Sequence, residues 1–115
     1  MAVNIKRIYD SPSAEDGYRV LVDRLWPRGV GKDKAQLDLW LKDAAPSAEL
    51  RQWFGHEPAK FKEFRVRYQA ELDKNQAVGQ LKEIIQKHRK LTLLYAARDP
   101  KINHAVVLRE YLGQS

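Results

Sequence analysis

Residues 23–29, Asp-Arg-Leu-Trp-Pro-Arg-Gly, place charge and a large aromatic ring directly after an apolar segment. The guanidinium groups of Arg24 and Arg28 can each make paired hydrogen bonds with a phosphate or a carboxylate, and the indole of Trp26 can stack on a base or a sugar. Asp23 adds a carboxylate that is suited to proton transfer. The run is therefore predicted to bind an anionic ligand.

A second polar stretch follows the apolar segment 91–97 and leads into a predicted helix. Unpaired backbone amides at the start of a helix offer a site for an anion, and a histidine in that place is suited to general acid or base chemistry. The predicted ligand-binding residues of the two stretches are Arg24, Trp26, Arg28, Tyr95, Arg98 and Asn103, and the predicted catalytic residues are Asp23, Asp99 and His104.

Most of these residues also have a structural interpretation. Arg98 with Asp99 could tie the end of the strand to its helix. Asp23 could form an ion pair with Arg24 or Arg28 that only holds the turn. Trp26, next to a proline, could be a packing anchor. Asn103 is a good helix N-cap, and His104 could extend that cap or bind a neighbouring carbonyl.

The elements that must position these residues follow from hydrophobic patterning and turn signals. Strands are predicted over residues 3–9, 18–25, 37–41 and 91–97, with an exposed loop around Gly29 and Gly31. Helices are predicted over 48–54, over 58–74, from about 79 to 88, and from 103 onward with Ala105, Leu108 and Leu112 facing inward.

This order predicts the α/β class: a compact single domain over residues 1–115, with a small, at least partly parallel sheet flanked by helices. The almost continuously apolar segment 91–97 is typical of a central strand that is covered on both faces. If this strand runs parallel to the strand at 18–25, both polar stretches lie at the same edge of the sheet. Open α/β sheets bind their ligands at that edge.

The amino-acid composition limits the classes of function that this chain can have. The 115 residues include 21 Lys and Arg against 15 Asp and Glu, so the net charge is +6 and the surface favours anionic partners. There is no cysteine, which excludes disulfides and thiolate chemistry. We expect a cytoplasmic protein, because no apolar run is long enough to span a membrane and residues 1–10 lack the apolar centre of a signal peptide.

Common catalytic signatures are missing. Gly29 and Gly31 lack the lysine and the serine or threonine that complete a Walker loop. The three histidines, His56, His88 and His104, are widely spaced, so we expect no metal centre, and no serine stands in a nucleophile elbow. The sequence predicts no cofactor.

Several separated blocks together resemble the YeaO-like family, a domain of unknown function (number 488), across nearly the whole chain. The blocks are residues 19–29, residues 38–42 with Trp40, Ala45-Pro46-Ser47 with Leu50, Phe64 with Tyr68, Glu71 and Leu72, residues 92–97, and Asn103-His104-Ala105. The resemblance implies a compact cytoplasmic α/β protein. The resemblance does not imply a substrate, and it does not distinguish an enzyme from a binding protein.

Three functional hypotheses follow. The first is an enzyme or binding domain for an anionic, phosphorylated or nucleotide-like small molecule held at the strand ends. The second is a nucleic-acid or protein interaction module whose basic surface includes Lys60, Lys62, Arg65, Arg67, Lys82, Lys87, Arg89 and Lys90. The third is a structural subunit that buries residues 23–29 against a partner. None of the three fixes an oligomeric state.

Overall fold

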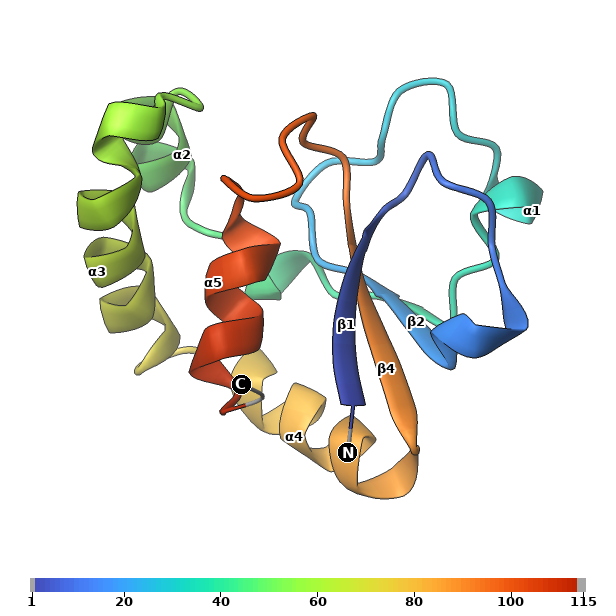
Figure 1. Cartoon of the computed structure of the whole chain (residues 1–115). Coiled ribbons are helices and arrows are strands. Elements are labelled where there is room, and N and C mark those ends of the chain that lie inside the picture. The colour runs from blue at the N-terminus through green and yellow to red at the C-terminus, as the bar shows by residue number, and fades with distance from the viewer. Residues whose placement is uncertain (1, 114–115) are drawn as a thin grey trace.

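The computed structural model describes residues 2–113, and within them the strands form one parallel sheet (Figure 1). The strand order is β1-β4-β2-β3, and every neighbouring pair is parallel. The strands are β1 (Ala2–Arg7), β2 (Tyr18–Leu21), β3 (Leu39–Trp40) and β4 (Lys90–Tyr95). The predicted α/β class is confirmed, and the sheet is parallel throughout its described strands.

Strand β4 is the central strand that the sequence predicts. It pairs with β1 on one side and with β2 on the other, so that Leu93 lies between Ile5 and Val20. Leu93 belongs to a large core on one face of the sheet, whereas Leu94 belongs to a smaller cluster on the opposite face. Both leucines are fully buried, as expected for a strand covered on two sides.

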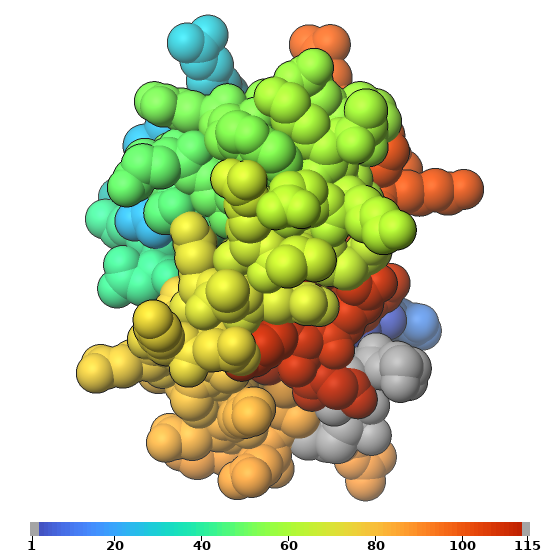
Figure 2. All heavy atoms as spheres, turned by 90° about the vertical axis from the view of Figure 1, so that its left-hand side faces the viewer, coloured from blue at the N-terminus to red at the C-terminus, as the bar shows by residue number. Residues whose placement is uncertain are grey.

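Most of the helices lie on one side of the sheet, which Figure 2 views directly. These are α2 (Ala48–Phe54), α3 (Phe61–Leu72), α4 (Ala77–Lys87) and α5 (His104–Tyr111). The short helix α1 (Lys32–Ala35) lies on the other side. No helix within residues 2–113 has the length and apolar character that crossing a bilayer requires.

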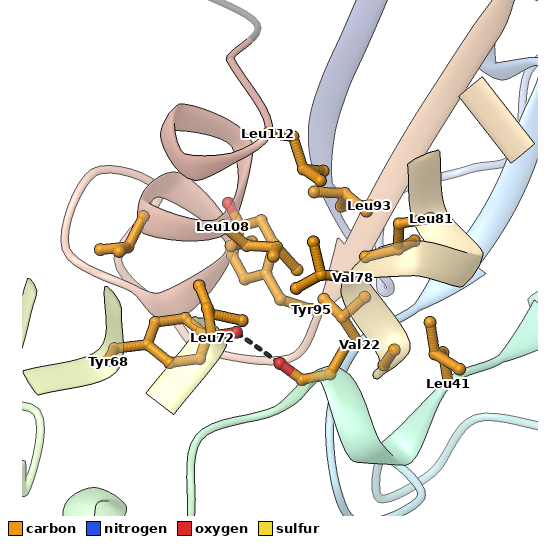
Figure 3. Packing of buried hydrophobic residues seen from close by; sticks show 14 of the residues in the cluster. Val22, Leu41, Tyr68, Leu72, Val78, Leu81, Leu93, Tyr95, Leu108 and Leu112 are labelled. Atoms are coloured by element: carbon orange, nitrogen blue, oxygen red, sulfur yellow. Dashed lines mark hydrogen bonds between the residues drawn. The ribbon is translucent and has the colours of Figure 1, made fainter. Parts of the chain in front are cut away.

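The main core lies between the sheet and the helices and is shown in Figure 3. Tyr68 and Leu72 of α3 and Leu108 of α5 are almost completely buried there. The hydroxyl of Tyr68 donates a hydrogen bond of 2.5 Å to the carbonyl of Ala44. This bond joins α3 to the short 3-10 helix Lys42–Ala44, which leads into α2.

The local signals for helices are accurate where a cap is present. Helix α2 begins after Ser47, whose hydroxyl accepts from the amide of Leu50, and ends at Gly55 in the left-handed conformation. Helix α5 begins after Asn103, whose side chain accepts from the amide of Val106. The Asn103 cap is confirmed, and at both positions a side-chain oxygen satisfies a free helix amide.

Several boundaries differ from the sequence prediction. Strand β3 is limited to Leu39–Trp40 and β4 ends at Tyr95, where strands were predicted over 37–41 and 91–97. Strand β2 ends at Leu21 and not near Leu25, because the side chain of Asp23, in place of the backbone, accepts from the amide of Ala96, the residue after β4. The helix predicted from residue 58 begins at Phe61, after the 3-10 turn Pro58–Lys60. Helix α1 was not predicted, since one helical turn in a polar segment leaves no apolar periodicity.

A buried ionic network closes the edge of the sheet at which β2 begins. The Asp16 carboxylate accepts from an Arg19 guanidinium nitrogen at 2.5 Å and from the Lys6 ammonium at 3.1 Å. Arg19 also donates to the carbonyls of Gln36 and Ala35. Burial alone would raise the pKa of Asp16, but the hydrogen bonds from the Ser13 amide, Lys6 and Arg19 outweigh it and lower that pKa.

Replacement of Asp16 by asparagine is expected to lower the free energy of unfolding by about 2–4 kcal/mol at neutral pH, because it leaves Arg19 buried without its counter-ion. Because folding lowers the pKa of Asp16, the stabilising contribution is complete above the unfolded-state value of about 4 and is lost below it. Urea unfolding of the wild type and Asp16→Asn as a function of pH should show the two curves converging below about pH 4. A gap that persists unchanged in acid would contradict this assignment.

Gly17 occupies a position that excludes a side chain. Its φ is +67°, and a Cβ there would lie 2.5 Å from both the Cβ and the carbonyl oxygen of Lys90. The close approach lets the chain enter β2 directly beside the start of β4. Gly29 has a similar φ of +75°, but nothing lies within 4 Å of a Cβ built there.

Comparing alanine substitutions at Gly17 and Gly29 distinguishes the cost of backbone strain from the cost of steric overlap. Gly29→Ala should lower stability by about 1 kcal/mol through its positive φ alone. Gly17→Ala carries the same strain plus a clash with backbone, so it should lower stability by at least about 2 kcal/mol more. Thermal or urea unfolding of both variants measures the difference, and equal losses would show that Lys90 moves aside at no cost.

Candidate functional site

A cavity of about 880 Å³ opens at the carboxyl ends of β2 and β4. Its size suits a small organic ligand. It is lined by Tyr9, Asp23, Arg24, Leu25, Trp26, Pro27, Arg28, Ala45, Pro46, Arg51, Gln52, Phe54, His56, Phe64, Ala96, Ala97, Arg98, Asp99, Ile102, Asn103 and His104. The structure thus brings the two predicted polar stretches together at one cavity, and Arg24 and Arg98 lie on its lining together.

Asp23 connects the elements that form the cavity. One carboxylate oxygen, Oδ2, accepts from the amide of Ala96 at 3.0 Å, which joins the end of β2 to the end of β4. Its backbone carbonyl accepts from the indole nitrogen of Trp40 at 2.8 Å, which adds β3. Its other carboxylate oxygen, Oδ1, lies 3.0 Å from Nε2 of His104 at the start of α5. Asp23 is therefore paired with a histidine, and the predicted structural ion pair with Arg24 or Arg28 does not form.

His104 is held in a defined orientation. Its Nε2 also lies 3.0 Å from the carbonyl oxygen of Val22, and this contact has hydrogen-bond geometry. The contact with Asp23 is close but not aligned, so Oδ1 has no hydrogen-bond partner among residues 2–113 although it is buried. Since Nε2 faces two acceptors, it carries the hydrogen of the neutral imidazole. The predicted alternative, in which His104 binds a neighbouring carbonyl, is realised through Val22.

Tyr68 packs against the ring of His104. Its ring lies 6.4 Å from that of His104 in an edge-on orientation. Complete burial, followed by the charges of Glu71 and Asp23, raises the pKa of Tyr68 far above its ordinary value. Tyr68 is therefore a neutral hydrogen-bond donor at any physiological pH.

Four arginines line the cavity without a carboxylate partner. They are Arg24, Arg28, Arg51 and Arg98, and none of them takes part in an ion pair with another described residue. Arg24 only approaches the carbonyls of Ala45 and Pro46, each at 3.4 Å, and its Nε is buried without a partner. The cavity therefore collects positive charge that the protein itself does not neutralise.

The rest of the lining is largely apolar and aromatic. Trp26 packs edge-on against Trp40 at 5.3 Å and donates its indole hydrogen to the carbonyl of Val30. It is thus the packing anchor that the sequence allowed, and it also lines the cavity. On the opposite side, Phe54 and Phe64 stack with ring centroids 4.2 Å apart.

Helix α2 brings residues to the cavity that the sequence analysis did not select. Glu71 of α3 accepts from both the amide and the hydroxyl of Ser47, which fixes the start of α2 against α3. This contact places Arg51 and Phe54 on the lining. Nothing near Arg51 in the sequence distinguishes it from a solvated helix residue, so only the docking of α2 identifies it.

Two predicted site residues are engaged in shaping the loop. Asp99 accepts from the amides of Lys101 and Ile102, and its carbonyl accepts from the side chain of Asn103. Asn103 is almost completely buried and caps α5, as its structural interpretation proposed. Both line the cavity, but their polar atoms are largely occupied by the backbone.

Tyr95 does not join the cavity lining. It is the last residue of β4, and its side chain is 2% exposed within the main core. Successive strand residues point to opposite faces of a sheet, so Tyr95 turns toward the helices while Leu94 turns away from them. The structure therefore places Tyr95 apart from the other predicted ligand-binding residues, which all line the cavity. Burial raises the pKa of Tyr95 as well.

No group of three or more histidine, aspartate or glutamate side chains within residues 2–113 is arranged to hold a metal ion. Asp23 and His104 are the two potential ligands that lie close together, at 3.0 Å, and they face each other and not a common point.

The fold and the cavity define a parallel-sheet α/β protein with a basic, partly aromatic cavity at the strand ends. Residues 2–115 match the family described as the inactive DUF488-N3 subclade, and the chain belongs to this family. It is 46% identical over 112 residues to the uncharacterised protein YeaO of Escherichia coli, covering 97% of each chain. It is 42% identical over 111 residues to uncharacterised proteins of Mycobacterium bovis and Mycobacterium tuberculosis, covering 96% of this chain and 93% of theirs. No solved structure matches the chain.

Removal of the Asp23 carboxylate is expected to destabilise the fold. Asp23→Ala leaves the amide of Ala96 without its acceptor and His104 without its carboxylate, so the free energy of unfolding should fall by about 2–4 kcal/mol. The matched control is Asp43→Ala, which removes an exposed carboxylate that forms no ion pair with a described residue. Urea unfolding that shows equal stability for the two variants would contradict the connecting role of Asp23.

Proposed function

We propose that this protein binds an anionic small molecule, phosphorylated or nucleotide-like, in the cavity at the strand ends. The observation that carries the proposal is the group of four cavity arginines without carboxylate partners. Elsewhere in the described chain, Arg19, Arg65 and Arg67 each form an ion pair with an acidic side chain. A cluster of unpaired guanidinium groups is costly to hold together unless an anion compensates it.

The apolar part of the lining supports a ligand larger than inorganic phosphate. Trp26, Phe54 and Ile102 offer contact surface for an uncharged body, while the arginines bind the charged group. An aromatic or sugar-like body attached to a phosphate would use both kinds of surface.

Binding without turnover fits the site better than catalysis. Asp99 is occupied by backbone amides, and one oxygen of Asp23 is occupied by Ala96. Two of the three predicted catalytic groups thus have structural tasks. The description of the family as inactive supports the same proposal.

The alternative of a nucleic-acid or protein interaction module has weaker support. Several of the basic residues that suggested it are compensated locally: Lys60 pairs with Glu57, Arg65 with Glu110 and Arg67 with Glu63. Lys62, Lys82, Lys87, Arg89 and Lys90 form no ion pair with a described residue, so they are the basic residues on which this alternative depends.

Thermal unfolding with a panel of ligands tests the proposal. The panel contains nucleoside monophosphates, sugar phosphates, phenyl phosphate, small carboxylates and, as uncharged controls, the corresponding nucleosides. A ligand at 100 times its dissociation constant should stabilise the wild type by about 2.7 kcal/mol. Arg28→Ala and Arg98→Ala should each weaken binding by about tenfold or more, because each removes charge-assisted hydrogen bonds.

The matched control is Arg89→Ala, which removes an exposed arginine that does not line the cavity. It should bind as the wild type does. Stabilisation by uncharged nucleosides equal to that by their phosphates, or no stabilisation by any anion, would overturn the proposal. In the latter case a strongly destabilised Arg28→Ala would assign the 23–29 run to the fold alone.

A further inference from the structure

We infer that His104 binds the ligand's anionic group through Nδ1, and that binding is coupled to the uptake of a proton on that nitrogen. This inference rests on the proposed function and assigns a specific role to the third predicted catalytic residue. It makes His104 a ligand-binding residue whose contribution depends on its protonation.

The two nitrogens of His104 have different surroundings. Nε2 lies 3.0 Å from the carbonyl oxygen of Val22 and 3.0 Å from Oδ1 of Asp23, so it is a donor in both protonation states. Nδ1 has no hydrogen-bond partner among residues 2–113 and is not a buried atom, and His104 lines the cavity. We therefore assign a second proton to Nδ1, the ring nitrogen that is left free for a ligand.

The carboxylate of Asp23 prepares the site for that proton. Oδ2 accepts from the amide of Ala96, but Oδ1 is buried, accepts no aligned hydrogen bond and lies beside the imidazole. When Nδ1 takes up a proton, the resulting imidazolium and the carboxylate form a close ion pair. Removing water from such a pair strengthens its attraction.

Other groups add positive charge to the cavity around His104. Positive charge reaches the cavity from Arg24 and Arg28 after β2, from Arg51 and His56 at α2, and from Arg98 after β4. The free amides at the start of α5 act in the same sense. Asp99 contributes a negative charge to the lining, and Tyr68 is neutral.

A bound anion reverses this balance. It neutralises the arginines, and its oxygens accept the new Nδ1–H as a charge-assisted hydrogen bond. Anion binding and proton binding on His104 therefore favour each other, and linkage requires the affinity for the anion to rise as the pH falls through neutrality.

Inorganic sulfate is the probe for this coupling, because its own charge is constant across the range in which histidine changes charge. Binding is measured by NMR titration and calorimetry at about pH 5.5 and about pH 8, and we expect at least fivefold tighter binding at the lower pH. Calorimetry in buffers with different enthalpies of ionisation should show net proton uptake on binding. Nitrogen-15 spectra of the histidine rings should show the hydrogen on Nε2 of His104 in the free protein and a second hydrogen on Nδ1 in the complex.

Three variants show which histidine couples sulfate binding to proton uptake. His104→Gln keeps a donor for the carbonyl of Val22 but lacks the titrating nitrogen, so sulfate binding should lose its proton uptake and most of its pH dependence. His88→Gln is the matched control outside the cavity, where its ring packs beside Tyr18. It should behave as the wild type does. His56→Gln, inside the cavity, should retain the coupling.

The outcomes separate this inference from the proposed function. If sulfate and phosphorylated compounds bind with no proton uptake, or if His56→Gln abolishes the coupling while His104→Gln retains it, the inference is wrong and the proposed function stands. If no anion binds at either pH, both are wrong. The nitrogen-15 spectra test the tautomer of His104 even if His104→Gln does not fold.

Discussion

Strand β4 lies between β1 and β2 and runs parallel to both, and this pairing decides where the polar side chains of the cavity lie. Strands β1 and β2 come first in the chain, and β3 and the helices α1 to α4 follow before β4 takes its place between them. Parallel neighbours end at the same edge of a sheet. Residues that follow β2 and residues that follow β4, more than seventy positions apart in the sequence, therefore meet there.

Asp23 fixes the residues that follow β2 relative to those that follow β4. The backbone ladder continues to Val22, whose amide donates to the carbonyl of Leu94, and the Asp23 carboxylate then takes the place of a strand carbonyl and accepts from Ala96. The cavity lies at these strand ends. The other oxygen of the same carboxylate lies beside Nε2 of His104, whose hydrogen bond to the Val22 carbonyl holds the ring. One side chain thus connects the ends of β2 and β4 with the start of α5.

The two edges of the sheet differ in how their basic side chains are compensated. At the edge where β2 begins, the Asp16 carboxylate forms ion pairs with both Lys6 and Arg19. At the opposite edge, the arginines around the cavity have no acidic partner among the described residues. The chain as a whole has a net charge of +6. The four arginines beside aromatic residues give the cavity its chemical character.

The sequence by itself determined the features that depend on near neighbours. Ser47, Gly55 and Asn103 set the limits of α2 and α5 through local hydrogen bonds and backbone conformation, and the apolar run of β4 required burial on both faces. It also identified both polar stretches, because charge and aromatic residues directly after a strand are visible without a fold.

Only the tertiary structure decided which of these residues act together. The place of Tyr95 in the core, the pairing of Asp23 with His104, and the presence of Arg51 at the cavity depend on the face to which a strand residue points and on how α2 docks against α3. Such contacts join positions that are distant in the chain, and the free energy that selects them belongs to the packed molecule as a whole. No local pattern of residues records it.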